Sequence, residues 1–240
     1  MSAILQPDEI LLANARLAEA SAEEVLRWAV ERFHPRLTMA TAFGVEGCCI
    51  IHMLAEIEPK VRVFNLDTGY QFAETLALRE TLKERYGIEV EYVRPETTTA
   101  EYEALHGGPL YVERPDQCCQ DRKIVPLRKA LVGYEGWISA IRADQTTDRA
   151  KANVVQWDEK FKLIKVNPLL HWTKVTVWNF VHKHKIPYNP LHDEGFASIG
   201  CQPCTRAVVD GEDERAGRWA GTAKKECGLH VLDHKDGSGI

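Results

Sequence analysis

Cysteines are the residues of this sequence whose type and spacing most directly indicate chemistry. Cys118 and Cys119 are adjacent, and Cys201 and Cys204 form a CxxC pair around Gln202-Pro203. Together they offer four thiolates, the number that completes a tetrahedral zinc site or one iron–sulfur cluster. Two inert buried thiols beside an unrelated CxxC redox motif would have the same spacing. The spacing therefore leaves three alternatives open: cluster, zinc and inert thiols.

A separate cysteine, Cys227, lies near the end of the chain in Lys224-Lys225-Glu226-Cys227-Gly228-Leu229-His230. Neighbouring cationic groups favour the thiolate, which is the form of cysteine that acts as a nucleophile. The flanking glycine and the polar residues 234–240 favour a mobile arm. The alternative is an incidental exposed cysteine. We expect a main domain over residues 1–222 and a tail, residues 223–240, that carries Cys227 as a nucleophile.

Composition limits the classes of function. The chain has 240 residues, 45% hydrophobic and 27% charged, which is the balance of a protein with a buried core. A net charge of −5 argues against nonspecific binding to nucleic acid or anionic membranes. There is no apolar run of about 18 residues and no basic leader, so we expect a cytoplasmic protein. Seven cysteines in that reducing compartment indicate metal binding or catalysis rather than disulfides.

The elements that position these residues alternate between strands and helices. Two helices precede residue 35, and Ser21 with Glu24 forms a capping box at the second. The alternation that follows predicts a parallel sheet with right-handed crossovers. Cys48 and Cys49 belong to an apolar helix that continues through Leu54, and we expect them to be core thiols. The predicted strands are 37–43, 61–66, 88–93, 137–141 and 161–166, and the later helices are 71–86, 118–131 and 174–184, the last capped by Thr173.

Two of the predicted strands end in loops suited to an anion. Residues 41–47 follow the first strand, and Leu66-Asp67-Thr68-Gly69 ends the second. Ligands of open α/β sheets bind at the carboxyl ends of the strands, where helix N-termini present free amides. Arginine and lysine side chains nearby suit phosphate or sulfate. The basic candidates are Arg122, Lys123, Arg142, Arg149, Arg206, Arg215 and Arg218.

Three motifs together resemble the assimilatory adenosine 5′-phosphosulfate (APS) reductases of the wider phosphoadenylyl-sulfate (PAPS) reductase family. They are Cys118-Cys119-x-x-Arg122-Lys123, Gly200-Cys201-x-Pro203-Cys204-Thr205-Arg206 and Lys225-Glu226-Cys227-Gly228-Leu229-His230. The resemblance extends from about residue 20 to residue 230. It implies a fold of the adenine-nucleotide α-hydrolase type, in which helices flank a parallel sheet.

The resemblance also implies a mechanism. One 4Fe–4S cluster per chain would be held by Cys118, Cys119, Cys201 and Cys204. Cys227 would attack the sulfur of APS, expel AMP and form a thiosulfonate, from which thioredoxin frees sulfite. Relatives are often dimers or tetramers. The implied substrate-binding residues are Thr41, Phe43 and Gly44 in the phosphate loop, Leu66, Thr68 and Gly69 at the adenosine, and Lys123, Arg142, Arg149, Arg215, Arg218 and His230 around the phosphosulfate end and lid.

Departures and alternatives accompany this resemblance. Only Trp219 follows Arg218 where many relatives have several tryptophans, and Phe43 replaces a serine that helps some members bind phosphate. A PAPS reductase or a dual-specificity enzyme is the nearest alternative, but PAPS reductases typically lack the four cysteines. A non-catalytic zinc module is another. A tRNA-thiolating ATP-pyrophosphatase would need a Ser-Gly-Gly-x-Asp-Ser loop, which residues 41–47 do not supply.

Overall fold

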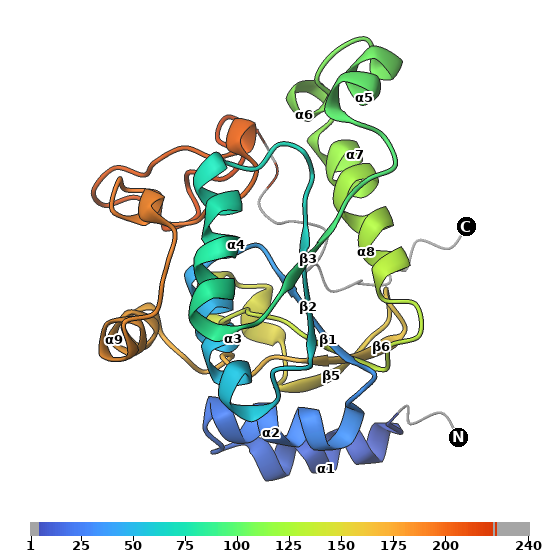
Figure 1. The fold of residues 1–240 in the computed structure, drawn as a ribbon, viewed down its shortest axis with the longest axis vertical. Helices are drawn as coiled ribbons and strands as arrows, with labels where there is room; N and C mark the ends of the chain where they lie inside the picture. Colours follow the sequence, from blue (N-terminus) through green and yellow to red (C-terminus); the bar gives the residue numbers. More distant parts are fainter. Residues whose placement is uncertain (1–4, 223, 225–240) are drawn as a thin grey trace.

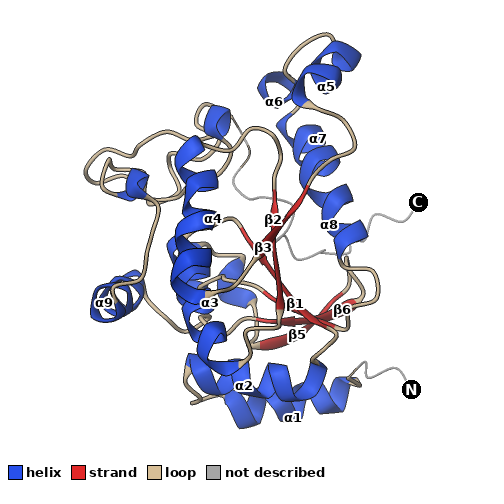
Figure 2. Ribbon diagram, in the orientation of Figure 1, coloured by secondary structure: helices blue, strands red, loops and turns tan. Residues whose placement is uncertain are grey.

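A six-stranded sheet forms the centre of the computed structural model, which describes residues 5–222 and 224 (Figures 1 and 2). The strand order is β3-β2-β1-β4-β6-β5. All neighbouring strands are parallel except β5 and β6. The strands are β1 Leu37–Thr41, β2 Arg62–Leu66, β3 Val90–Val93, β4 Gly136–Ile138, β5 Val155–Asp158 and β6 Leu163–Val166. The predicted alternation of strands and helices is confirmed.

The antiparallel edge strand β5 corrects the expectation of a wholly parallel sheet. Residues 159–162 join β5 to β6, a connection short enough for a hairpin and too short for a parallel crossover. The backbone at the outer edge of β5 forms hydrogen bonds with the side chain of Asn14. The Asn14 amide donates to the Val155 carbonyl at 2.7 Å and accepts from the Val155 N–H at 3.0 Å. This pairing satisfies backbone groups that an edge strand otherwise exposes.

Helices cover both faces of the sheet (Figure 1). Their predicted N-caps are confirmed: the Ser21 side chain accepts from the Glu24 N–H, and the Thr173 side chain accepts from the Thr176 N–H. No helix in the described part of the chain is both long and apolar enough to cross a lipid bilayer. The helices are α1 Pro7–Leu17, α2 Ala22–Phe33, α3 Val45–Ile57, α4 Ala73–Tyr86, α5 Thr99–His106, α6 Leu110–Glu113, α7 Pro115–Cys119, α8 Val125–Ala130 and α9 Lys174–His184.

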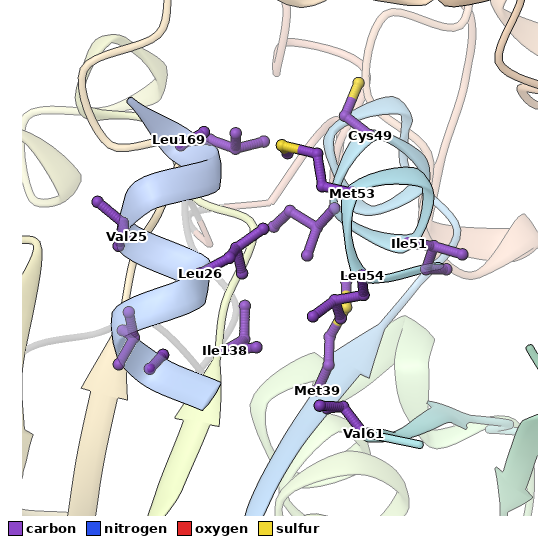
Figure 3. Close-up of a cluster of buried hydrophobic side chains, with 14 of the residues drawn as sticks. Val25, Leu26, Met39, Cys49, Ile51, Met53, Leu54, Val61, Ile138 and Leu169 are labelled. Carbon is purple, nitrogen blue, oxygen red and sulfur yellow. The ribbon is translucent and has the colours of Figure 1, made fainter. Parts of the chain in front are cut away.

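The main core lies between the sheet and the layer that contains α2 and α3. Leu26 of α2, Leu54 of α3 and Met39 of β1 meet there with no exposed surface (Figure 3). Cys48 and Cys49 are fully buried in the same core, as predicted. Burial raises the pKa of Cys48 to about 12 and also raises the pKa of Cys49, so both remain protonated thiols near neutral pH.

The predicted helix over residues 118–131 is present but interrupted by a π turn. Gln120–Ile124 is π-helical and separates α7 from α8. Pro126 lacks an N–H, and its ring would clash with the Arg122 carbonyl in a regular α-helix, so the wider turn has a local cause. The buried Arg122 side chain donates to the carbonyl oxygens of Thr68 at 2.7 Å and Thr97 at 3.2 Å. The turn is thereby fixed to the end of β2.

The chain reverses its direction across the sheet at β1. From β1 it proceeds outward through β2 and β3, and it then returns to place β4 on the opposite side of β1. In open α/β sheets the crevice outside such a switch point is the usual position of a ligand. Here the crevice is bordered by the segments that follow β1 and β4, residues 42–44 and 139–142.

Candidate functional site

A cavity of about 210 Å³ lies at this switch point. Thr41 and Gly44 border it from the β1 end, Leu66 from the β2 end, and Ser139 and Ile141 from the β4 end. Parallel strands bring their carboxyl ends to one edge, so residues far apart in sequence form one wall. We call this cavity the switch-point pocket.

The loop after β1 shapes one side of the switch-point pocket. Phe43 has a positive φ of 55°, and its N–H donates to the Thr41 hydroxyl at 3.0 Å. The Phe43 side chain is buried in the core at 1% exposure and does not line the pocket. Helix α3 begins directly after the loop, so its first N–H groups face the same region. The loop therefore presents backbone donors to an anion, as at other helix N-termini.

Four predicted cationic residues line the switch-point pocket: Lys123, Arg149, Arg215 and Arg218. Lys123 comes from the π turn, Arg149 begins the 3-10 helix Arg149–Lys151, and Arg215 and Arg218 come from a later loop. Arg215 contacts the Ser198 hydroxyl at 3.5 Å. Guanidinium and ammonium groups gathered at one cavity favour a phosphate or sulfate ligand.

Both cysteine motifs line a second, smaller cavity. Cys118 and Cys119 reach it from α7, and Cys201 and Cys204 reach it from the loop on the opposite side. The Thr68 hydroxyl lies 3.2 Å from Cys201 Sγ. Burial, together with the nearby Cys201 and Cys204 sulfurs, raises the pKa of Cys118 to about 11. The structure thus gathers four thiols, whose thiolate forms would repel one another unless a cation lay between them.

The arrangement of these thiols bears on the kind of metal group that fits. Within residues 5–222 and 224, no group of three or more His, Cys, Asp and Glu side chains is arranged to hold a metal ion. A zinc ion requires four ligand sulfurs about 2.3 Å from one point. In a 4Fe–4S cluster each cysteine binds a different iron, so the sulfurs remain apart. The four thiols that line the cysteine cavity supply the number of ligands that either group requires.

The two cavities share a wall. Lys123 and Cys201 border both the switch-point pocket and the cysteine cavity. A metal group in the cysteine cavity would therefore lie next to the cationic end of the pocket. Lys123 follows Cys119 by four residues across the π turn, which explains how one short helical segment serves both cavities.

Other predicted residues lie outside the switch-point pocket. Thr68 borders the cysteine cavity, and Gly69 forms a tight turn with φ 77° beside Arg122. Arg142 lies beneath the pocket among carboxylates. Cys227 and His230 fall outside the described residues.

The last described residue, Lys224, reaches the cysteine-bearing helix α7. Its ammonium group contacts the Asp116 carboxylate at 2.5 Å and lies 5.3 Å from the centre of the Trp219 ring. Trp219 itself borders the cysteine cavity. The chain thus arrives at the cysteine cavity immediately before the segment that carries Cys227.

Several residues line the switch-point pocket without having been predicted, among them Ser139, His192, Ser198 and Glu214. Ser139 directly follows β4, so the rule that pointed to Thr41 at the end of β1 would also have found it. Its hydroxyl donates to Asn167 at 2.6 Å. His192 ends the short 3-10 helix Pro190–His192 and Ser198 lies in an irregular loop, and neither setting has a periodic pattern that indicates which side chains face inward.

Comparisons with known proteins give a consistent result. Residues 36–207 match the family model described as the phosphoadenosine phosphosulfate reductase domain. The chain is 44% identical to an adenosine 5′-phosphosulfate reductase of Bacillus pumilus, with 86% of this chain and 89% of that protein aligned. It is also 44% identical to a phosphoadenosine 5′-phosphosulfate reductase of Gloeobacter violaceus, over 87% and 88%. A crystal structure of the Candida auris PAPS reductase superposes with a TM-score of 0.75 at 30% identity, covering 85% of this chain and 98% of that one.

Proposed function

Because this chain belongs to the phosphoadenosine phosphosulfate reductase family, a family of enzymes, we propose that it reduces APS to sulfite and AMP. In this proposal Cys227 is the nucleophile, thioredoxin is the reductant, and the reaction takes place in the cytoplasm. The observation that carries the proposal is the wall that the cysteine cavity shares with the cationic switch-point pocket. The fold class expected from the motifs is confirmed, apart from the antiparallel edge strand.

The proposed reaction has three steps. The Cys227 thiolate attacks the sulfur of APS, so that an S–S bond forms, the bond from sulfur to the bridging oxygen breaks, and AMP leaves with that electron pair. A thioredoxin thiolate then attacks Cys227 Sγ, and sulfite leaves with the electrons of the S–S bond. The second thioredoxin thiol resolves the mixed disulfide. The dithiol loses two electrons and sulfur gains two.

The pocket supplies what this chemistry needs. Attack brings a thiolate toward an anionic substrate, so the reaction requires fixed positive charge around the reacting sulfur. Lys123, Arg215 and Arg218 border the pocket and can provide it. The position of Lys224 supports a role for Cys227, because three peptide units span at most about 11 Å. Lys224, three residues before Cys227 in the sequence, contacts Asp116 of α7, the helix that carries Cys118 and Cys119.

A 4Fe–4S cluster in this proposal would be held by Cys118, Cys119, Cys201 and Cys204. When bound, the cluster supplies local electrostatics beside Lys123 rather than the reducing electrons. The four cysteines would then join α7 to the loop that carries Cys201 and Cys204, and this link would keep Lys123 and Gly200 at the edge of the pocket.

We expect APS to be the better substrate. The four cysteines favour APS, whereas the 44% identity to a protein named PAPS reductase favours the alternative of PAPS or dual specificity. Sulfite release with thioredoxin, measured side by side for both nucleotides, should give a kcat/KM at least about tenfold higher for APS. A preference for PAPS would contradict the substrate proposal and leave the family intact. Sulfite release from neither would contradict the reductase proposal for this chain.

We expect Gly200→Ala to weaken nucleotide binding. A Cβ at Gly200 would lie 2.2 Å from Arg218 Nη2 and 2.5 Å from Cζ, so the guanidinium must leave its position. Loss of a charge-assisted hydrogen bond costs about 1.5–3 kcal/mol, or roughly a 10- to 100-fold rise in the KM for APS. The matched control is the same change in an Arg218→Ala background, where the methyl group meets no guanidinium. An equal loss in both backgrounds would show that Gly200 does not act through Arg218.

A further inference from the structure

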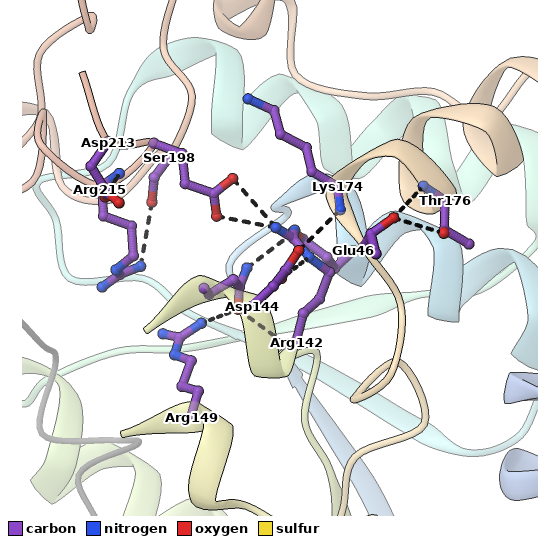
Figure 4. Close-up of polar contacts among 12 residues, drawn as sticks. Glu46, Arg142, Asp144, Arg149, Lys174, Thr176, Ser198, Asp213 and Arg215 are labelled. Atoms are coloured by element: carbon purple, nitrogen blue, oxygen red, sulfur yellow. Dashed lines mark hydrogen bonds and ion pairs between the residues drawn. The ribbon is translucent and has the colours of Figure 1, made fainter. Parts of the chain in front are cut away.

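Arg142 lies at the centre of a network of three carboxylates beside the switch-point pocket (Figure 4), and two of them, Glu46 and Glu214, border that pocket. Its side chain is 3% exposed. Nη1 donates to Glu46, Nε donates to Asp144 at 2.9 Å, and Nη2 donates to both oxygens of Glu214 at 3.1 and 3.3 Å. Each nitrogen of the guanidinium is thus engaged by a carboxylate, and Arg142 does not border the pocket.

One branch of this network leads to Arg149. The Arg142 backbone N–H donates to Gln145 Oε1 at 3.0 Å, and Gln145 Nε2 donates to Glu46 Oε1 at 3.1 Å. These two bonds fix the orientation of the Gln145 amide. Its oxygen then accepts a hydrogen bond from Arg149 Nη1. Arg149 borders the pocket, so its guanidinium is oriented through Gln145.

A second branch leads to Arg215. Glu214 belongs to the long loop between Cys204 and Trp219, which has no helix or strand. Its two hydrogen bonds to Arg142 attach that loop to the end of β4. Arg215 is the next residue and borders the pocket, where it contacts Ser198. Burial raises the pKa of the Glu214 carboxyl, whereas the Arg142 charge opposes that rise.

We infer that Arg142 is a positioning residue, which holds Arg149 and Arg215 at the switch-point pocket without touching the substrate itself. This inference rests on the proposed function and revises the expectation that Arg142 binds substrate. The physical reason is donor capacity, because a guanidinium whose three nitrogens already serve carboxylates has little left for a phosphate or sulfate. Its position also neutralises Glu46, which would otherwise repel an anion at the start of α3.

The test is a double-mutant cycle between Glu214 and Arg215. Removing Arg142 outright would leave three carboxylates near one another and could unfold the chain, so Glu214→Gln is the first variant. APS binding is measured by calorimetry in a Cys227→Ser protein, in which no turnover is expected. We expect Glu214→Gln to raise the Kd for APS about tenfold, which equals about 1.4 kcal/mol. In an Arg215→Gln background, Glu214→Gln should raise the Kd for APS less than about twofold, because the guanidinium that Glu214 would help to position is already absent.

A second variant tests Arg142 itself. Arg142→Lys keeps one charge but offers a single ammonium group, so it cannot serve three carboxylates in the same geometry. In the otherwise unchanged chain, we expect Arg142→Lys to raise the Kd for APS about tenfold or more. In a background that carries Arg149→Gln and Arg215→Gln, the same substitution should raise the Kd less than about twofold. A direct substrate contact would instead give the same fold-change in both backgrounds, and that additive result would overturn the inference.

The matched control is Glu212→Gln. Glu212 lies in the same loop and also pairs with an arginine, Arg206, at 2.8 Å through each oxygen, yet it does not border the switch-point pocket. The Kd of the Glu212→Gln variant for APS should differ from that of the parent protein by less than about twofold. An equal effect of Glu212→Gln and Glu214→Gln would indicate a general effect on the loop and overturn the inference. Absence of APS binding in every protein would count against the proposed function instead.

Discussion

A Cys227→Ser variant is expected to bind APS with normal affinity and to release no sulfite. A serine hydroxyl is scarcely ionised at neutral pH without a dedicated base, so it cannot replace a thiolate at the sulfur. We expect a loss of about 10⁴-fold or more, the scale on which removal of a catalytic nucleophile usually falls. The measurement is sulfite release with thioredoxin, together with calorimetric binding of APS to show that the pocket is intact.

The wild-type protein provides the complementary result. Mixed with APS in the absence of thioredoxin, it should gain one SO₃ group by intact mass, and peptide mapping should place that group on Cys227. Cys48→Ala is the matched control, because burial raises the pKa of this thiol to about 12 and keeps it protonated. The control should retain full activity. Modification of Cys48 or Cys49, or an active serine variant, would show that Cys227 is the wrong nucleophile.

Most of the fold could be predicted from local patterns. Buried parallel strands give short apolar runs, and helix caps such as Ser21 with Glu24 depend on residues a few positions apart. The strand β5 could not be predicted in this way. It is an edge strand with mixed burial, and it is supported by Asn14, which lies more than a hundred residues earlier in the sequence. Such long-range support leaves no periodic signal in the strand itself.

The site could be predicted in part where its residues lie close together in the sequence. Both cysteine motifs and Lys123 reach adjoining cavities, although the spacing of the cysteines left a cluster, a zinc site and inert thiols open. The role of Arg142 could not be predicted from the sequence. Its residue type fits an anion, but its partners Glu46 and Glu214 lie 96 and 72 residues away in sequence, and only the fold brings them together. Residue type alone cannot distinguish an arginine that contacts substrate from one that positions others.

We expect the four cysteines at the cysteine cavity to hold an iron–sulfur cluster. Protein purified without oxygen should be brown and contain about four irons per chain, because four thiols from two segments line one cavity. Replacing Cys201 by serine removes a ligand from the wall shared with the switch-point pocket. We expect that variant to lose most of its iron and visible absorbance. Its melting temperature should also fall by several degrees, because metal binding that favours the folded state contributes to stability.

The matched control for this prediction is Cys49→Ser. Cys49 is also a buried cysteine, but it lies in the hydrophobic core with Leu54 and does not border the cysteine cavity. Serine at that position can lower stability by burying a hydroxyl, yet iron content per folded chain should not change. Iron and zinc are measured together by elemental analysis.

A colourless protein with one zinc per chain would contradict the cluster, and equal iron loss in both variants would show that Cys201 is not a ligand. Iron loss confined to the cavity cysteines, with Cys49→Ser unaffected, would separate metal ligation from general destabilisation, because Cys118, Cys119, Cys201 and Cys204 line a common cavity.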